Sequence, residues 1–277
     1  MTIDEIIASA LLEDIGDGDH TSLSTIPHDA KGKARLLVKE DGILAGIEIA
    51  RKVFSQVDPL TVFTPYRKDG DSIKIGDIVF TVEGRSISLL SSERLALNFL
   101  QRMSGIATAT HKITSMLSDL PVKLLDTRKT TPLLRELEKY AVKMGGGENH
   151  RFGLFDMILI KDNHVDYAGG TKQAIRAANA YLIKNLLNLK IEIEVRSFSE
   201  LDEVLEEGHV HRIMLDNFNP ADLRKAVDLI AKRYETEASG GITVHNIRQY
   251  AETGVDYISV GALTHHIKSL DLSLKAY

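Results

Sequence analysis

From about residue 120 onward, short apolar segments alternate with stretches of helical periodicity. Such repeated strand–helix units predict a parallel β-sheet, either open or closed into a barrel. Ligands bind beyond the carboxyl ends of parallel strands, and nearly every candidate strand here ends in a polar residue or a glycine. Several functional strand ends favour an α/β barrel, because an open sheet would use one switch point. The candidate strands are residues 123–126, 157–162, 191–195, 212–216, 236–240 and 257–261, which carry Asp126, Lys161, Glu194, Asp216, Ser239 and Gly261 at or near their ends.

The first hundred residues follow a different pattern. Apolar side chains recur at helical spacing over residues 3–13, which predicts an amphipathic helix. Residues 33–82 hold short segments of branched side chains separated by glycines, a pattern typical of a small, largely antiparallel sheet. Residues 87–117 predict either one long helix or two consecutive helices.

The composition excludes several classes of protein. Of 277 residues, 43% are apolar and 26% are charged, as in globular proteins that bury a substantial core. A net charge of −5 argues against nucleic-acid binding, and the absence of cysteine excludes disulfides, thiolate nucleophiles and cysteine zinc sites. The N-terminal segment is acidic where a signal peptide needs positive charge, and no apolar run approaches the roughly 20 residues of a membrane span. We therefore expect a cytoplasmic protein with no membrane partner.

One basic stretch lies between Asp126 and His164 of this acidic chain. Its bases surround turns that contain proline or consecutive glycines, and they are Arg128, Lys129, His150, Arg151 and Lys161. Arginine and lysine supply the donors that carboxylates and phosphates need, and glycines let a backbone approach a ligand closely. The stretch therefore predicts a site for a small polyanion, although each base taken alone also fits an ordinary solvated surface.

The residues after Arg128 and Lys129 carry the signals of a helix start. Pro132 suits the first position of a helix, and Thr131 suits the N-cap before it. A helix N-terminus beside two cations favours an anion, so this interpretation supports the same polyanion site.

Two acids, Glu192 and Glu194, interrupt an otherwise apolar strand. Buried parallel strands are usually continuous apolar runs, so acids within one need a cation, a metal or a ribose hydroxyl as partner. Glu194 and Asp216 together could coordinate Mg²⁺, which favours one or two carboxylates plus substrate phosphates. Structural ion pairs with neighbouring bases are the alternative.

Two glycine-bearing loops follow the last two strands. Ser239, Gly240 and Gly241 follow one strand, and Gly261 closes the next. Backbone amides beside the late strands form the usual phosphate site of a barrel. The chain has no HExxH zinc motif, no GxxxxGK[ST] nucleotide loop and no GxSxG nucleophile turn, so those chemistries are not expected.

Taken together, these segments resemble the quinolinate phosphoribosyltransferase family, the carboxylating nicotinate-nucleotide pyrophosphorylases. The resemblance runs almost from end to end of the chain. Its long central motif is highly specific and shows no departure at a position the family uses. The matching segments are LLEDIGDGDHTS, SSERLALNFLQRMSGIATAT, DTRKTTPLLRELEKYAVKMGGGENHRFGLFDMILIKDNH, IEIEVRSF, MLDNF, EASGGIT and SVGALTH.

The resemblance implies an activity, a fold and an assembly. The reaction would transfer phosphoribosyl from phosphoribosyl pyrophosphate to quinolinate with Mg²⁺, giving nicotinate mononucleotide, carbon dioxide and pyrophosphate for NAD biosynthesis. The fold would be an N-terminal α/β sandwich with a mostly antiparallel sheet, packed on an incomplete parallel α/β barrel. We expect the sandwich in residues 1–105 joined by 266–277, and the barrel with the active site in 106–265. The protein would be a homodimer.

The resemblance also assigns roles to individual residues. The quinolinate-binding bases would be Arg128, His150, Arg151 and Lys161, with Lys129 on the pyrophosphate side. The neighbouring subunit would donate Arg94 across the dimer interface. Glu194 and Asp216 would lie near the ribose and the metal, and with Lys129 and Lys161 they form the expected catalytic set. The phosphate-binding end would comprise Ser239, Gly240, Gly241, Gly261 and His265.

Two alternative functions follow from the same residues. One is a related phosphoribosyltransferase of the same fold that acts on nicotinate or another pyridine carboxylate, or a molybdenum-locus homologue; these would be expected to change the central basic motif. The other is a non-catalytic sensor that binds phosphate or a dicarboxylate. Glu194 and Asp216 argue against a sensor, because pure anion binding gains nothing from two acids.

Overall fold

The computed structural model describes residues 1–277, and the chain forms two compact units. Unit 1 comprises Met1–Lys112, Thr130–Gly146 and Leu263–Tyr277, and unit 2 comprises Ile113–Lys129 and Gly147–Ala262. The domain boundaries expected from the sequence, 1–105 with 266–277 and 106–265, stay a prediction. No helix is both long enough and apolar enough to cross a membrane.

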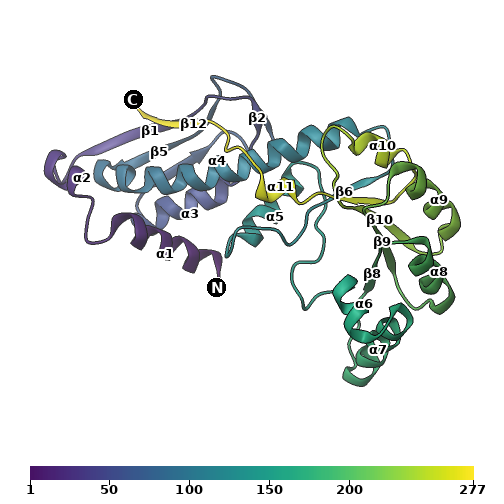
Figure 1. Ribbon diagram of the computed structural model, residues 1–277. Helices are drawn as coiled ribbons and strands as arrows, with labels where there is room; N and C mark the ends of the chain where they lie inside the picture. The colour runs from purple at the N-terminus through teal and green to yellow at the C-terminus, as the bar shows by residue number, and fades with distance from the viewer. The chain divides into compact units, whose positions relative to one another are not determined.

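Unit 1 contains a four-stranded antiparallel sheet in the order β12-β1-β5-β3. The strand bounds are β1 Lys31–Val38, β3 Val62–Pro65, β5 Ile78–Arg85 and β12 Leu272–Ala276, and a two-stranded sheet joins β2 Gly42–Ile43 to β4 Ser72–Ile73. The C-terminal strand β12 pairs with β1, so the end of the chain completes a sheet begun near its start (Figure 1). The antiparallel sheet expected from residues 33–82 is confirmed.

Helices supply the rest of unit 1. They are α1 Ile3–Ile15, α2 His20–Thr25, α3 Ile47–Val57, α4 Ser86–Met116, α5 Arg135–Met144 and α11 Ala262–His265, of which α4 continues into unit 2 and α11 begins there. The core forms where α3 meets the sheet: Phe54 and Phe80 are buried and pack edge to face with ring centroids 6.3 Å apart. The region expected to be one or two helices is the single helix α4.

The expected start of the helix after Lys129 is wrong. Helix α5 begins at Arg135, with Leu134 rather than Thr131 at the N-cap position. Leu133 has a positive φ of 67°, which a right-handed helix cannot include, so Pro132 lies in a turn. The Thr131 hydroxyl instead accepts a hydrogen bond from Arg102 at 2.7 Å.

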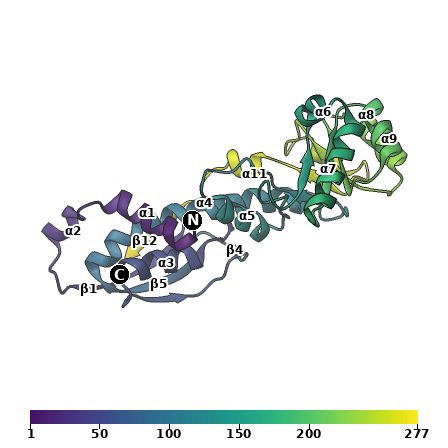
Figure 2. The same cartoon turned by 90° about the horizontal axis from the view of Figure 1, so that it is seen from below.

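Unit 2 is a six-stranded parallel sheet in the order β6-β11-β10-β9-β8-β7. The strands are β6 Lys123–Leu125, β7 Ile158–Ile160, β8 Ile191–Val195, β9 Arg212–Asp216, β10 Glu235–Ser239 and β11 Tyr257–Ser259. The helices are α6 Asp162–Ala168, α7 Thr171–Asn185, α8 Phe198–Glu207, α9 Pro220–Ile230 and α10 Ile247–Ala251. Figure 2 shows α6, α7, α8 and α9 beside the strands of unit 2. All six strands expected from the sequence are present, as an incomplete barrel whose end strands are β6 and β7.

Three consecutive glycines, Gly145, Gly146 and Gly147, follow helix α5. The first two have structural roles within unit 1. A Cβ on Gly145 would stand 2.6 Å from the Cβ of Thr110 on α4, so only glycine lets α5 end this close to that helix. Gly146 has a positive φ of 88° and turns the chain out of α5. Gly145 and Gly146 are therefore explained by helix packing and by the turn after α5, and neither needs a ligand to account for it.

Candidate active site

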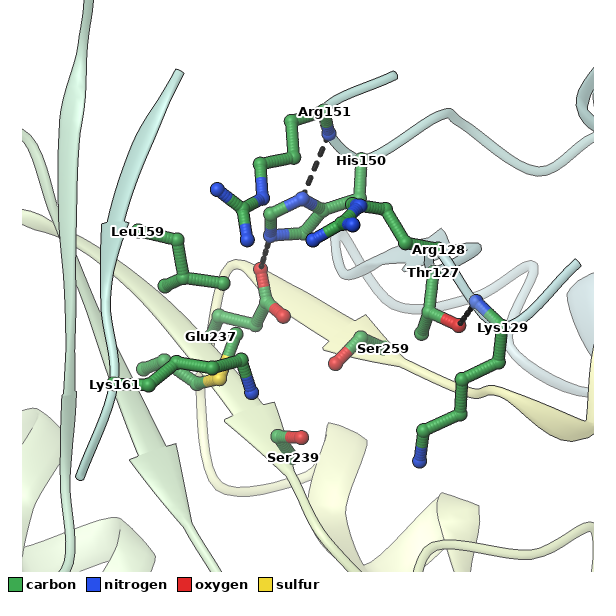
Figure 3. Close-up of a pocket in the computed structure, with 11 residues that line it drawn as sticks. Thr127, Arg128, Lys129, His150, Arg151, Leu159, Lys161, Glu237, Ser239 and Ser259 are labelled. Carbon is green, nitrogen blue, oxygen red and sulfur yellow. Dashed lines mark hydrogen bonds and ion pairs between the residues drawn. The ribbon is translucent and has the colours of Figure 1, made fainter. Parts of the chain in front are cut away.

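A pocket opens at the carboxyl ends of the unit 2 strands (Figure 3). Because the strands are parallel, the loops that follow them meet at the same edge of the sheet. The expected residues that line the pocket are Arg128, Lys129, His150, Arg151, Lys161 and Ser239. Thr127, Leu159, Met214, Glu237 and Ser259 also line it and were not expected from the sequence.

The loop after β6 presents two of the bases. The Lys129 amide donates to the Thr127 hydroxyl at 3.1 Å, a local turn that directs the chain away from the strand. Figure 3 shows Arg128 beside His150 and Arg151, while Lys129 and Lys161 approach from other sides of the pocket. This gathering of five basic residues from separate loops favours a ligand with more than one negative charge.

His150 is buried, and both of its ring nitrogens contact protein groups. Its Nδ1 accepts the Arg151 amide at 2.7 Å, and its Nε2 lies 2.8 Å from Glu192 Oε2 and 3.4 Å from Glu237 Oε2. The His150 amide donates to the buried carboxylate of Asp126 at 2.9 Å, which holds the loop against β6. His150 therefore links a pocket loop to acids beneath it.

The charge on His150 depends on opposing influences. Burial lowers its pKa, but the carboxylates of Glu192 and Glu237 outweigh burial and raise the pKa to about 9. The hydrogen bond from the Arg151 amide favours the unprotonated Nδ1, and a neutral bond of this kind is worth about 1 kcal/mol, or less than one pKa unit. Two acids nearby shift a pKa by more than that, so we expect His150 to be cationic at neutral pH.

Glu237 belongs to a buried ionic cluster below the pocket. Arg212 lies 3.2 Å from Glu237 and 3.0 Å from Glu235, and its guanidinium stacks 3.9 Å from the ring centre of Tyr257. Burial and the neighbouring Glu237 raise the pKa of Glu192 to about 7. Burial opposes ionisation of Glu237 too, but His150 and Arg212 bring its pKa below the usual value. Glu237 could have been found from the sequence by the same signal as Glu192, because each is an acid within a buried strand.

Lys161 and two acids form a second group at the ends of β7, β8 and β9. The Lys161 Nζ lies 3.1 Å from Glu194 Oε2, and Glu194 is buried. Burial first, and then repulsion from Glu194, raise the pKa of Asp216. Asp216 and Glu194 are thus close enough to influence each other, and Lys161 supplies a cation beside them.

The remaining expected residues divide between the two units. Gly240 and Gly241 follow β10 with positive φ values of 93° and 63°, and Gly261 follows β11, so all three lie at the strand ends of unit 2. Arg94 on α4 and His265 at the end of α11 belong to unit 1.

Comparisons with known proteins match nearly the whole chain. Residues 19–104 match the family model for the quinolinate phosphoribosyl transferase N-terminal domain, and residues 106–275 match the C-terminal domain of the same enzyme. Quinolinate phosphoribosyltransferase [decarboxylating] 1b of Nicotiana tabacum is 46% identical over 98% of this chain and 81% of that protein. Probable nicotinate-nucleotide pyrophosphorylase [carboxylating] of Bacillus subtilis is 42% identical over 99% of this chain and 93% of its own length. The crystal structure of NadC from Streptococcus pyogenes has a TM-score of 0.94 at 42% identity, covering 99% of this chain and 95% of that one.

Proposed function

Because the chain belongs to the quinolinate phosphoribosyltransferase family, we propose that the unit 2 pocket binds quinolinate and phosphoribosyl pyrophosphate together. The enzyme transfers the phosphoribosyl group to the pyridine nitrogen and releases carbon dioxide and pyrophosphate, which leaves nicotinate mononucleotide for NAD biosynthesis. The observation that carries the proposal is the position of Lys161, between a cluster of bases and the acid Glu194.

The bases of the pocket account for binding of the pyridine substrate. Quinolinate carries two carboxylates, and Arg128, Arg151 and Lys161 supply charged donors from three different loops. His150 adds a further positive charge when its ring is protonated. Lys129 stands apart from this group in Figure 3 and is assigned to the pyrophosphate side. Complementary charge of this kind orients both substrates before reaction.

The acids account for the sugar side of the reaction. As pyrophosphate leaves, the bond from the anomeric carbon to oxygen breaks and positive charge develops on the ribose ring. Glu194 and Asp216 stabilise that charge electrostatically, as preorganised groups do in many enzymes. Mg²⁺ held by the same two carboxylates would neutralise charge on the substrate phosphates.

The loss of carbon dioxide needs the opposite charge. The bond from pyridine C2 to its carboxylate carbon breaks, the electron pair stays on C2, and a proton then replaces the lost group. A cationic side chain beside C2, Lys161 or Arg128, stabilises the negative charge that develops there.

Further groups complete the proposed enzyme. Ser239, Gly240, Gly241 and Gly261 of unit 2 form the phosphate-binding end. The role that the resemblance gives to His265, a residue of unit 1, stays a prediction. The assembly is a homodimer in which Arg94 of one subunit reaches the site of the other. The location remains a prediction: the names of some plant relatives place them in the chloroplast or the mitochondrion.

The function is tested by measuring pyrophosphate release with Mg²⁺, phosphoribosyl pyrophosphate and either quinolinate or nicotinate. We expect release that depends on quinolinate and is absent with nicotinate. Activity only with nicotinate would establish the alternative pyridine carboxylate. Tight binding of quinolinate without any turnover would establish a non-catalytic binding protein.

A further inference from the structure

Asn217, the residue directly after β9, has an unusual backbone conformation. Its φ is 57°, in the left-handed region that asparagine tolerates better than most residues other than glycine. Its amide still donates to the Ser239 carbonyl at 2.8 Å, where Asp216 and Ser239 are the last paired residues of β9 and β10. The left-handed turn therefore redirects the chain without the loss of a hydrogen bond between the strands.

The side chain of Asn217 contacts the acid that precedes it. Its Nδ2 donates to Asp216 Oδ2 at 2.5 Å, a hydrogen bond strengthened by the charge of the acceptor. A carboxylate at the end of a strand otherwise has several rotamers available, and fixing one of them costs conformational entropy. The amide therefore selects one orientation of Asp216 before any ligand binds.

The same side chain also packs against the glycine turn of the next strand. A Cβ on Gly240 would stand 2.6 Å from Asn217 Cγ and 2.9 Å from the Asn217 backbone nitrogen. Gly240 has a positive φ of 93°, so both its conformation and its closeness to Asn217 require glycine. One amide side chain thus contacts two neighbouring strand ends, an acid on one and a glycine turn on the other.

We propose that Asn217 is a positioning residue that fixes the Asp216 carboxylate relative to the Ser239–Gly240 turn. This inference rests on the proposed function, which assigns Asp216 to the ribose and metal and the turn to a phosphate. The residue acts through these two groups and does not need to touch the pyridine substrate. Its loss therefore weakens phosphoribosyl pyrophosphate binding and leaves quinolinate binding unchanged.

Asn217→Gly is the most informative substitution, because glycine keeps the left-handed backbone while the amide is removed. The KM for phosphoribosyl pyrophosphate should rise about tenfold, the effect of one charge-assisted hydrogen bond, and the KM for quinolinate should stay within about twofold. Asn217→Asp, which keeps the shape but puts a second negative charge beside Asp216, should raise the same KM at least as much.

His209→Gly is the matched control. His209 is an exposed polar residue with a φ of 58° that precedes the opposite end of β9, so its replacement changes the backbone in the same way far along the strand from Asp216. We expect both KM values to be unchanged in this variant. Thermal unfolding of all the variants shows whether an effect reflects the site or the fold.

Crystal structures of the wild type and of Asn217→Gly provide a readout that does not need turnover. The Asp216 carboxylate should adopt more than one rotamer in the variant and one in the wild type. The inference would be overturned if the wild type and Asn217→Gly had equal KM values for phosphoribosyl pyrophosphate. It would also be overturned if the Asp216 carboxylate kept a single, unchanged rotamer in the variant crystal. A wild type that fails to turn over quinolinate would instead overturn the proposed function, and the crystal comparison would still decide the role of Asn217.

Discussion

At the scale of single residues, the chemistry depends on pairs that lie far apart in the sequence. The basic stretch could be identified because its bases surround turns with proline or consecutive glycines, Glu194 because acids are unusual within a buried strand, and Asp216 because ligands bind beyond the carboxyl ends of strands. The partners of His150 could not be identified in the same way. Glu192 and Glu237 reach it from β8 and β10, and that proximity depends on the order of the strands.

The charge of His150 makes the stability of the protein depend on pH. Its pKa in the folded protein is about 9, above the ordinary value of 6.5, so its contribution is fully present below pH 6.5 and is lost as the pH rises through 9. The free energy of unfolding of the wild type should therefore fall between pH 7 and pH 9.5 more steeply than that of His150→Gln.

Glu237→Gln tests the cause of this pH dependence. Removal of one carboxylate should bring the pKa of His150 down, so the loss of stability should begin at lower pH. Glu235→Gln is the control, because Glu235 shares the partner Arg212 but is not a contact of His150. Identical pH profiles for Glu237→Gln and the wild type would contradict the assignment of the charge.

The two acids of the sugar side are tested by removing their charges together. Glu194→Gln with Asp216→Asn should lower kcat at least about a hundredfold, as expected when preorganised charge is removed from a transition state. Quinolinate binding, measured by calorimetry, should persist, because the pocket bases are unchanged. Wild-type turnover in this double variant would refute an electrostatic role for the acids.

At the scale of elements, apolar runs bounded by polar residues located the six strands of unit 2 to within about two residues. The start of α5 was misplaced because proline and threonine signal a helix while nothing about the side chain of Leu133 signals its positive φ.

What replaces the expected cap is a contact between α4, Thr131 and α5. Arg102 on α4 contacts Glu138 of α5 at 2.6 Å and Thr131 at 2.7 Å, and the Thr131 amide donates to Glu138 at 3.2 Å.

This contact predicts a large effect on stability. Glu138 is 1% exposed, so Arg102→Met should lower the free energy of unfolding by about 3–5 kcal/mol, because a buried carboxylate loses its charged partner. Urea denaturation measures the change. Arg102→Met combined with Glu138→Gln should lose less than the single variant, since no buried charge is left unpaired. An equal or greater loss in the double variant would argue against this explanation.

At the scale of the whole molecule, the sequence predicted two architectures, but not the strand order within either sheet. Strand order depends on which apolar faces pack together, and in unit 1 it brings the last strand beside the first.

β12 contributes the buried side chains of Leu272 and Leu274. Deletion of residues 272–277 should therefore lower the free energy of unfolding by about 3–6 kcal/mol, from the burial of two leucines. Unchanged denaturation would show that the C-terminal strand is dispensable.

The central claim is that one site transfers the phosphoribosyl group and removes the 2-carboxylate of quinolinate. Quinolinate labelled at either carboxylate, supplied with phosphoribosyl pyrophosphate and Mg²⁺, tests it most directly. We predict that the 2-carboxylate label leaves as carbon dioxide in a one-to-one ratio with pyrophosphate, while the 3-carboxylate label stays in the mononucleotide. Retention of both labels in the product, or release of labelled carbon dioxide without phosphoribosyl pyrophosphate, would contradict the account.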